Sequence, residues 1–351
     1  MLRLYLRALC ELTGPSGRVD LVVFNDPSLP PDRLAAFSTS NLAAAIGCAR
    51  SRWRFVFHTL RLSRRAGMIV CGHLFQLPVA WLAQRLNPRL RYVLVAHGIE
   101  VWRTYSFLER RALLGASRIL CVSEFTRREM LARLPLRPER LVVVPNALDP
   151  RFASFLTAAA DPSSAPVILA VARLDAHDRE KGLDHLLQAL PAVKAAVPEA
   201  RLVIVGTGTD LPRLKALAQE LGLERAVEFT GAVDDEELVR RYAACRVFAL
   251  PSRKEGFGLV FLEAMAHGRP CVAARAGGVP EVIDETCGLL VDYGDVPALA
   301  QACVAALTRA WDPAAIQRHA AGFSYQCFRD RLAASLPGSF RLQPTLATAG
   351  S

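Results

Sequence analysis

Lysine is scarce in this sequence, and paired cysteines are missing. Only 4 of the 43 basic residues are lysine. The nine cysteines contain no C-x-x-C pair, so zinc-ribbon and thioredoxin-like sites lack support. We expect free, buried thiols of a reducing compartment instead. The first ten residues hold two arginines and no continuous apolar run, and they do not predict a signal peptide.

One uncharged stretch, residues 66–84, is long enough to cross a bilayer. Its middle contains glycine, histidine, glutamine and proline, which suit a chain reversal better than a membrane span. We therefore predict a buried strand at Met68–Cys71, a turn, and a helix from about Leu77, rather than a transmembrane helix.

The positive charge is confined to the first half of the chain. Up to residue 160 there are 23 arginines, no lysine and 10 acidic residues, a net charge of +13, whereas the remainder has 20 basic and 23 acidic residues. Arginines flank the apolar segment 53–57, at Arg50, Arg52, Arg54, Arg61, Arg64 and Arg65. Such a surface predicts binding to anionic lipid headgroups, at about 1 kcal/mol per basic residue. Nucleic acid is the alternative partner, but no nucleic-acid motif accompanies the patch. An ordinary solvated helix face is the third interpretation.

Short β-branched runs alternate with longer helical patterns, and 52% of the 351 residues are apolar. This predicts two doubly wound α/β domains, at residues 1–155 and 165–312. The expected strands of the first are 19–25, 68–71, 91–96, 119–122 and 141–144. Those of the second are 167–172, 201–205, 227–229, 247–250, 271–274 and 288–291. Residues 152–166 have linker composition, 313–337 a helical pattern, and 338–351 the composition of a mobile tail.

The loop after the predicted strand Val247–Leu250 carries the most specific signal. It contains Gly-Phe-Gly at 256–258 and leads directly into a helical pattern, so free N–H groups of the helix start can hold phosphate. Glu255 lies just outside that helix, and Glu263 about one turn inside it. The two carboxylates flank the anion site, and each can accept hydrogen bonds from a sugar diol. Either glutamate alone would suit a solvated or capping role.

Two cations are expected at a neighbouring strand end. Arg173 follows the predicted strand 167–172, and Lys181 opens the next helix. Both would flank the crevice at the carboxyl ends of the strands, where they can neutralise a diphosphate. With four lysines in the chain, Lys181 is not a default of composition, although a surface lysine at a helix start is the alternative interpretation.

Together these features resemble family 4 of the glycosyltransferases, retaining nucleotide-sugar enzymes with the GT-B fold of two Rossmann-like domains facing a cleft. The family's pattern of two glutamates separated by seven residues is met at Glu255 and Glu263. The resemblance spans roughly residues 90–310. Its further motifs are His-Gly-Ile-Glu-Val-Trp at 97–102, Val-Ser-Glu-Phe-Thr at 122–126, Val-Pro-Asn-Ala-Leu-Asp at 144–149, Val-Gly-Thr-Gly at 205–208, Gly-Ala-Val at 231–233 and Gly-Gly-Val-Pro-Glu at 277–281.

The resemblance implies a role for each matching residue. Arg173 and Lys181 would bind the donor diphosphate and stabilise charge on the departing nucleotide. Glu263 would hold the ribose hydroxyls, Glu255 the hydroxyls of the donor sugar, and His97 would face that sugar across the cleft. The other donor-binding positions are Gly206, Val233, Gly256, Phe257, Gly258 and Leu259, with backbone N–H groups of the last three aiding Glu255.

The activity so implied is transfer of a mannose- or glucose-type hexose from a UDP- or GDP-sugar. The acceptor would be a lipid-linked or polysaccharide chain of the cell surface, such as lipopolysaccharide. The protein would be cytoplasmic and peripheral on the inner membrane face, with no nucleic-acid partner. No Asp-x-Asp motif stands in the relevant loops, so no metal or other cofactor is expected. The oligomeric state is not predicted.

Three alternatives stay open. The first is a related GT-B phosphorylase or sucrose-type synthase, and the second is an inactive binding or scaffold copy. The third, a dehydrogenase, would need a third glycine after the Val-Gly-Thr-Gly turn, and residue 211 is leucine.

Enzymes of this family begin with a strand and a glycine-rich loop before their first helix. Here residues 1–12 already have a helical pattern. We therefore expect the first domain to lack its first, normally central strand, which leaves a gap one strand wide or forces the neighbours to re-pair. The expected origin is a true start codon upstream of Met1; an in-frame stop there would instead indicate a degenerate copy.

Overall fold

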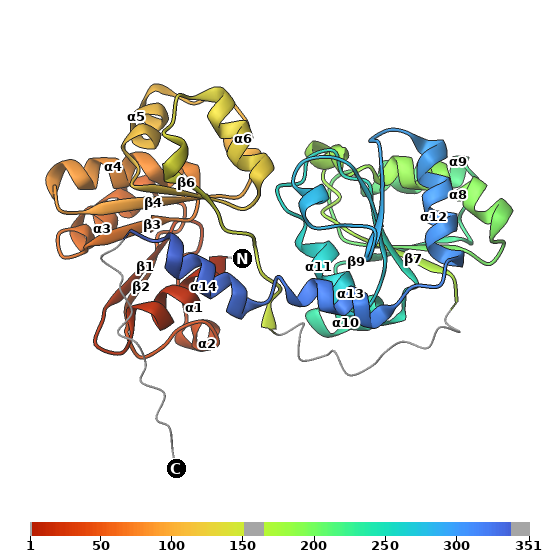
Figure 1. The fold of residues 1–351 in the computed structure, drawn as a ribbon, viewed down its shortest axis with the longest axis horizontal. Coiled ribbons are helices and arrows are strands. Elements are labelled where there is room, and N and C mark those ends of the chain that lie inside the picture. The colour runs from red at the N-terminus through yellow and green to blue at the C-terminus, as the bar shows by residue number, and fades with distance from the viewer. Residues whose placement is uncertain (1, 151–164, 338–351) are drawn as a thin grey trace, which may run out of the picture. The chain divides into compact units, whose positions relative to one another are not determined.

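The computed structural model describes residues 2–150 and 165–337, and these form two compact α/β units (Figure 1). The first unit contains the chain up to Ala147 and again from Tyr325, and the second unit contains Leu148–Ser324. The predicted linker, for the most part, and the predicted tail 338–351 fall outside the described residues.

The second unit is built on one six-stranded parallel sheet of order β12-β11-β10-β7-β8-β9. Its strands are β7 (Val167–Val171), β8 (Arg201–Val205), β9 (Val227–Gly231), β10 (Val247–Leu250), β11 (Cys271–Ala274) and β12 (Gly288–Val291). Its helices are η4 (Ala176–Lys181), α8 (Leu183–Ala196), α9 (Leu211–Glu220), α10 (Asp235–Ala244), α11 (Leu259–Ala266), η5 (Val279–Glu281), α12 (Val296–Thr308) and α13 (Pro313–Ala321). Helices α8, α9 and α12 cover one face, and α10, α11 and α13 the other (Figure 1).

All six strands of this sheet were expected from the sequence. Every residue of β10 and β11 is buried, because helices cover both faces and each strand is a continuous apolar run. The chain starts at β7, proceeds to β8 and β9, and then crosses to β10 on the other side of β7. The strand order therefore reverses between β7 and β10, which is where ligands of such sheets bind.

The first unit has two separate parallel sheets. One has the order β3-β4-β5-β6, with β3 (Met68–Cys71), β4 (Arg91–Ala96), β5 (Arg118–Cys121) and β6 (Leu141–Val143). The other pairs β1 (Val19–Val23) with β2 (Leu42–Gly47). The helices are α1 (Leu2–Thr13), α2 (Pro31–Ala35), α3 (Arg52–Ser63), η1 (Leu74–Gln76), α4 (Leu77–Leu86), η2 (Ile99–Val101), α5 (Phe107–Gly115), α6 (Glu124–Arg133), η3 (Pro138–Arg140) and α14 (Tyr325–Ser335).

The strands of the first unit form two sheets that no strand joins within the described chain, and the expectation of a missing strand stays a prediction. In the described chain β1 pairs only with β2, and β3 only with β4, so the neighbours have not re-paired across the gap. Helix α1 covers both sheets. Its Leu4 and Tyr5 pack with the core of the larger sheet, while Leu6 and Cys10 pack with the residues of the β1–β2 pair.

The unit boundaries differ from those expected at 155–165 and 313. The change of unit falls at Ala147, and the expected helical segment 313–337 is divided between the units. Helix α13 packs on α11 of the second unit. Helix α14 belongs to the first unit, because its apolar stripe at Phe328, Leu332 and Leu336 is buried against α1 and the larger sheet. That destination depends on a distant partner surface, which the sequence pattern does not contain.

Residues 66–84 form β3, η1 and most of α4, as predicted. Within the described chain, every helix is either too short or too polar to cross a bilayer. None of the nine cysteines forms a disulfide, and eight of them are buried, as expected for thiols of this kind. The expected reducing compartment stays a prediction.

Candidate active site

Two loops meet at the carboxyl edge of the second unit's sheet, at the point where the strand order reverses. Lys181 ends η4, which follows β7, and Glu255 lies in the loop after β10. Because β7 and β10 are neighbours, their loops emerge side by side. Lys181 Nζ lies 2.7 Å from Glu255 Oε2, with the two side chains 21% and 17% exposed. The structure thus brings together two residues that the sequence predicted for one site, 74 positions apart.

Arg173 follows β7 at the same edge, but its side chain is 75% exposed. Its guanidinium pairs with Asp178 of η4 at 2.9 Å. The sequence analysis did not foresee this partner, because two charges five residues apart carry no specific signal. An anionic ligand that recruits Arg173 has to compete with the Asp178 carboxylate.

The loop from Gly256 to α11 forms an anion cradle. Gly258 has a φ of +94° immediately before the helix, and a side chain there would collide with the ring of Phe261. Phe257 is buried with its ring against Phe323. Within the described residues, the N–H groups of Phe257, Gly258 and Leu259 donate to no protein acceptor. Unpaired donors at the positive end of a helix are available to an anion.

Gly277 and Gly278 pack against the backbone of Glu255. Gly278 N–H donates to the Glu255 carbonyl at 2.8 Å. Gly277 has a φ of +59°, and a Cβ at that position would collide with the same carbonyl. The backbone of Glu255 is therefore held against a segment that only glycine permits at this point.

Glu263 lies inside α11 and accepts a hydrogen bond from the hydroxyl of Tyr242, in α10, at 2.8 Å. Burial raises the pKa of Glu263 to about 7, although the Tyr242 hydrogen bond lowers it. The carboxyl is therefore close to half-ionised at neutral pH, and ligands that donate hydroxyls to it favour the ionised form. Tyr242 was missed by the sequence analysis, since a single helical tyrosine carries no motif.

Gly206 and Val233 follow β8 and β9 at the same carboxyl edge. The N–H of Gly206 donates to the Gly231 carbonyl at 2.9 Å, which ties the two loops together. Gly206 has a φ of +143°, and a side chain there would collide with the Ala172 carbonyl. Because Gly206 has no side chain, the turn after β8 can approach the end of β7 more closely than it could with any other residue at this position.

His97 follows β4 in the first unit. Its N–H donates to Glu100 Oε1 at 2.6 Å, and its ring Nε2 is buried with no partner among the described residues. Burial lowers the pKa of His97, so the imidazole is neutral at pH 7. The expectation that it faces the donor sugar stays a prediction.

Among the described residues, one group of three metal-ligating side chains stands close together, and it is formed by Asp284, Cys287 and His319. None of these residues belongs to the loops that carry Lys181 and Glu255. The expectation of a metal-free donor site stays a prediction.

Two family models together match nearly the whole described chain. Glycosyltransferase Family 4 matches residues 7–152, and Glycosyl transferases group 1 matches residues 165–309. A D-inositol 3-phosphate glycosyltransferase of Segniliparus rotundus is 30% identical over 343 residues, covering 91% of this chain and 74% of that protein. The chain belongs to the family 4, group 1 glycosyltransferases.

Other relatives of this glycosyltransferase match over a shorter length. A GDP-mannose-dependent alpha-(1-6)-phosphatidylinositol monomannoside mannosyltransferase of Mycolicibacterium smegmatis is 42% identical over 145 residues, 39% of this chain and 37% of that protein. The chain therefore matches little more than a third of the length of such relatives.

Solved structures show the GT-B fold. A lipopolysaccharide outer core galactosyltransferase has a TM-score of 0.73 at 18% identity, over 95% of this chain and 93% of that one. Anabaena HepE in complex with UDP and glucose has a TM-score of 0.71 at 22% identity, over 94% and 95%.

Proposed function

We propose that this protein is a retaining hexosyltransferase, which moves a mannose- or glucose-type sugar from a nucleoside diphosphate to a lipid-linked or polysaccharide acceptor. The observation that carries the proposal is the Lys181–Glu255 pair beside the unpaired N–H groups of α11. Cation and N–H groups suit a diphosphate, and the adjoining carboxylates suit sugar and ribose hydroxyls.

In the proposed reaction the bond between the anomeric carbon and the diphosphate oxygen breaks, and the hydroxyl oxygen of the acceptor forms a new bond to that carbon. Negative charge develops on the departing nucleoside diphosphate, which can take up the proton that the acceptor hydroxyl loses. Lys181 and the N–H groups of Phe257, Gly258 and Leu259 are already oriented, so they offset that charge without reorganisation. Glu255 holds the hydroxyls of a sugar that becomes oxocarbenium-like. The cations and the helix start thereby take the role that a metal ion has in other transferases.

GDP-mannose is the favoured donor, since relatives from Mycolicibacterium smegmatis and Corynebacterium glutamicum are named as GDP-mannose-dependent mannosyltransferases. The test is to incubate the purified protein with GDP-mannose or UDP-glucose, with and without a lipid extract as acceptor, and to follow nucleotide release and thermal stability. Donor at about 100 times its Kd adds about 2.7 kcal/mol of stability. Release of sugar 1-phosphate on adding phosphate would favour the phosphorylase. No stabilisation and no release with either donor would favour the scaffold.

The same proposal assigns the acceptor to the surface of a membrane, at its cytoplasmic face. Among the described residues, the exposed large apolar side chains all lie between Leu2 and Leu114 in the first unit. On α3, Trp53 and Phe57 are 86% and 61% exposed, and Arg61 and Arg64 continue the same helical face. Helices α3, α4 and α5 pack in succession (Figure 1), and each presents exposed arginines and apolar residues. Such a face suits anionic lipid.

Arg61→Gln/Arg64→Gln is expected to weaken binding to anionic vesicles by about 2 kcal/mol, or roughly 30-fold, because each basic residue near the surface contributes about 1 kcal/mol. Vesicle co-sedimentation measures this. Arg201→Gln/Arg225→Gln removes two exposed arginines from the second unit and is the matched control, with no loss expected. Equal losses in the two double variants would contradict a specific membrane face on α3.

Gly277→Ala is expected to weaken donor binding roughly tenfold or more, because its Cβ displaces the backbone of Glu255. Gly222→Ala is the matched control, since φ is +65° there but open space surrounds the position. Both variants should lose roughly 1–2 kcal/mol of stability to the left-handed backbone, whereas only the first should lose donor affinity by calorimetry. Equal donor affinity in the two variants would remove the supporting role given to Gly277.

A further inference from the structure

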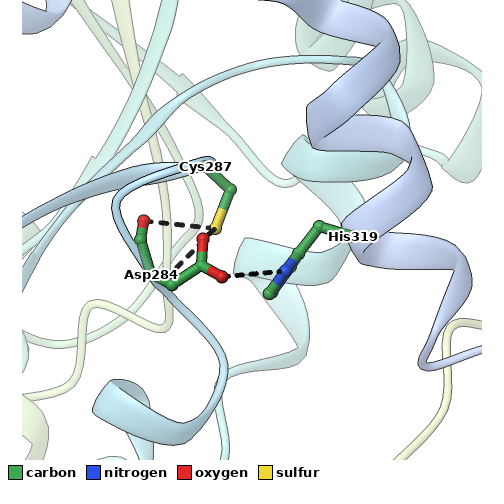
Figure 2. Close-up of side chains that lie close together, drawn as sticks. All are labelled: Asp284, Cys287 and His319. Carbon is green, nitrogen blue, oxygen red and sulfur yellow. Dashed lines mark hydrogen bonds and ion pairs between the residues drawn. The ribbon is translucent and has the colours of Figure 1, made fainter.

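Three metal-ligating side chains converge in the second unit, away from the loops of Lys181 and Glu255. Asp284 and Cys287 lie in the segment between η5 and β12, and His319 lies on α13. Figure 2 shows the three pointing toward one another. Asp284 Oδ2 is 3.3 Å from His319 Nδ1, and Cys287 Sγ is 3.5 Å from Asp284 Oδ1.

The imidazole is oriented by a backbone group on its other side. His319 Nε2 lies 2.9 Å from the carbonyl oxygen of Val282. A carbonyl only accepts hydrogen bonds, so Nε2 carries a proton and Nδ1 is the ring atom that faces Asp284. Nδ1 and the Asp284 carboxylate, 3.3 Å apart, can hold either a proton or a metal ion between them. Metal-binding histidines are commonly oriented by a carbonyl in this way.

The sulfur is oriented toward the same point. The N–H of Asp284 donates to Cys287 Sγ at 3.3 Å, and Cys287 is fully buried. One ligand atom of each of the three residues lies within 4.8 Å of the other two. The remaining side is open, because the Asp284 side chain is half exposed. An ion therefore has an entry path and a position for a water ligand.

We propose that Asp284, Cys287 and His319 bind a zinc ion, with water as the fourth ligand. Sulfur and imidazole ligands favour Zn²⁺ over Mg²⁺ or Ca²⁺, which take oxygen ligands. In tetrahedral zinc sites with bonds of about 2.0–2.3 Å, neighbouring ligand atoms are roughly 3.4–3.6 Å apart. The separations of 3.3 and 3.5 Å are of this size, each measured to a different oxygen of the Asp284 carboxylate.

The ion would join α13 to the segment before β12. Gly277 and Gly278, which support the backbone of Glu255, precede η5 in the same connection between β11 and β12. Zinc would therefore stabilise the second unit and hold this segment in place without touching the donor. The proposal rests on the geometry of these residues alone and does not depend on the transferase activity.

The test uses the full chain, stripped with a chelator and titrated with ZnCl₂. We expect one zinc per chain and a higher melting temperature with zinc. Cys287→Ser and His319→Gln should each weaken zinc binding at least about 100-fold. Two variants are used so that a folding defect in one still leaves the other to test the site. Circular dichroism checks that each variant is folded. Cys303→Ser, at another buried free thiol, is the matched control and should bind like the wild type.

Cobalt gives a second measurement, because a Cys287 thiolate bound to Co²⁺ should produce a sulfur-to-metal charge-transfer band that Cys287→Ser lacks. Fewer than one zinc per chain at saturation, or wild-type affinity in folded Cys287→Ser and His319→Gln, would overturn the site. A loss of the same size in folded Cys303→Ser would overturn it as well.

Discussion

Lys181→Ala is expected to lower the rate of sugar transfer roughly 10²–10³-fold, the effect typical of losing one preorganised group that offsets developing charge. Lys181 is the cation seated beside the α11 N–H groups and already paired with Glu255, at 2.7 Å. The rate is measured as nucleotide release from the donor in the presence of an acceptor extract. Binding of the free nucleoside diphosphate should weaken in the same variant.

Lys254→Ala is the matched control. Lys254 is in the same loop as Glu255 and makes an ion pair of the same length, 2.7 Å, with Glu180, but both its side chain and its partner are more exposed. We expect transfer within about twofold of the wild type, since exposed ion pairs contribute little. A loss in Lys254→Ala as large as in Lys181→Ala would mean that the loop's general charge, and not Lys181, matters.

Glu255→Gln separates two roles of the pair. Transfer should fall sharply, because the carboxylate that receives the sugar hydroxyls is lost. Binding of the free nucleoside diphosphate should instead strengthen, because the anion no longer competes with Glu255 for Lys181. Opposite changes in diphosphate affinity for Glu255→Gln and Lys181→Ala are therefore expected. Weaker diphosphate binding in both variants would contradict this account.

Glu263 is expected to make the stability of the protein fall as pH rises from about 4.5 to about 7. Its pKa is about 7 in the folded protein against 4.5 for the ordinary group. The native state therefore binds more protons across this window, and the stabilisation present below pH 4.5 is lost as the pH passes 7. The loss amounts to at most about 3 kcal/mol. Urea unfolding at a series of pH values measures it.

Glu263→Gln is the test variant. The difference in the free energy of unfolding between wild type and variant should show this fall with pH. Tyr242→Phe should raise the Glu263 pKa further, because the hydrogen bond that lowers it is removed. The free energy of unfolding should then keep falling to a pH above 7. Donor affinity should rise roughly tenfold from pH 6 to pH 8 in the wild type, since the ionised carboxylate accepts the ribose hydroxyls. Parallel pH profiles in wild type and Glu263→Gln would rule out this titration.

Much of the second unit could be predicted, because its strands are continuous apolar runs and its candidate site residues stand directly after them. Strands β7 and β10 are neighbours in one parallel sheet, so the loops that follow them emerge at the same edge. Lys181 and Glu255 lie in these loops, and for this reason they come together. Strand β2 was missed, because Leu-Ala-Ala-Ala-Ile-Gly contains three alanines and only one β-branched residue, Ile46, and so gives a weak strand signal.

The rest depended on contacts between distant segments. Tyr242 reaches Glu263 from another helix, and α14 joins the first unit through a surface that its own pattern does not specify. The ligands Cys287 and His319 come from a loop and a helix that share no spacing signature of a metal site. Side chains of this kind become partners only after the backbone has been placed.

Because the strands of the first unit form two separate sheets, the two are aligned by side-chain packing, in which helix α1 takes a central part. Leu4 and Tyr5 of α1 pack against the larger sheet, and Leu6 and Cys10 pack against the β1–β2 pair. Successive residues of a helix are 100° apart around its axis, so these two faces have a fixed angle between them. A rotation of α1 about its axis would move both contacts together. The β1–β2 pair is thus aligned to the larger sheet by packed side chains, those of α1 among them, with no strand hydrogen bond joining the two sheets in the described chain.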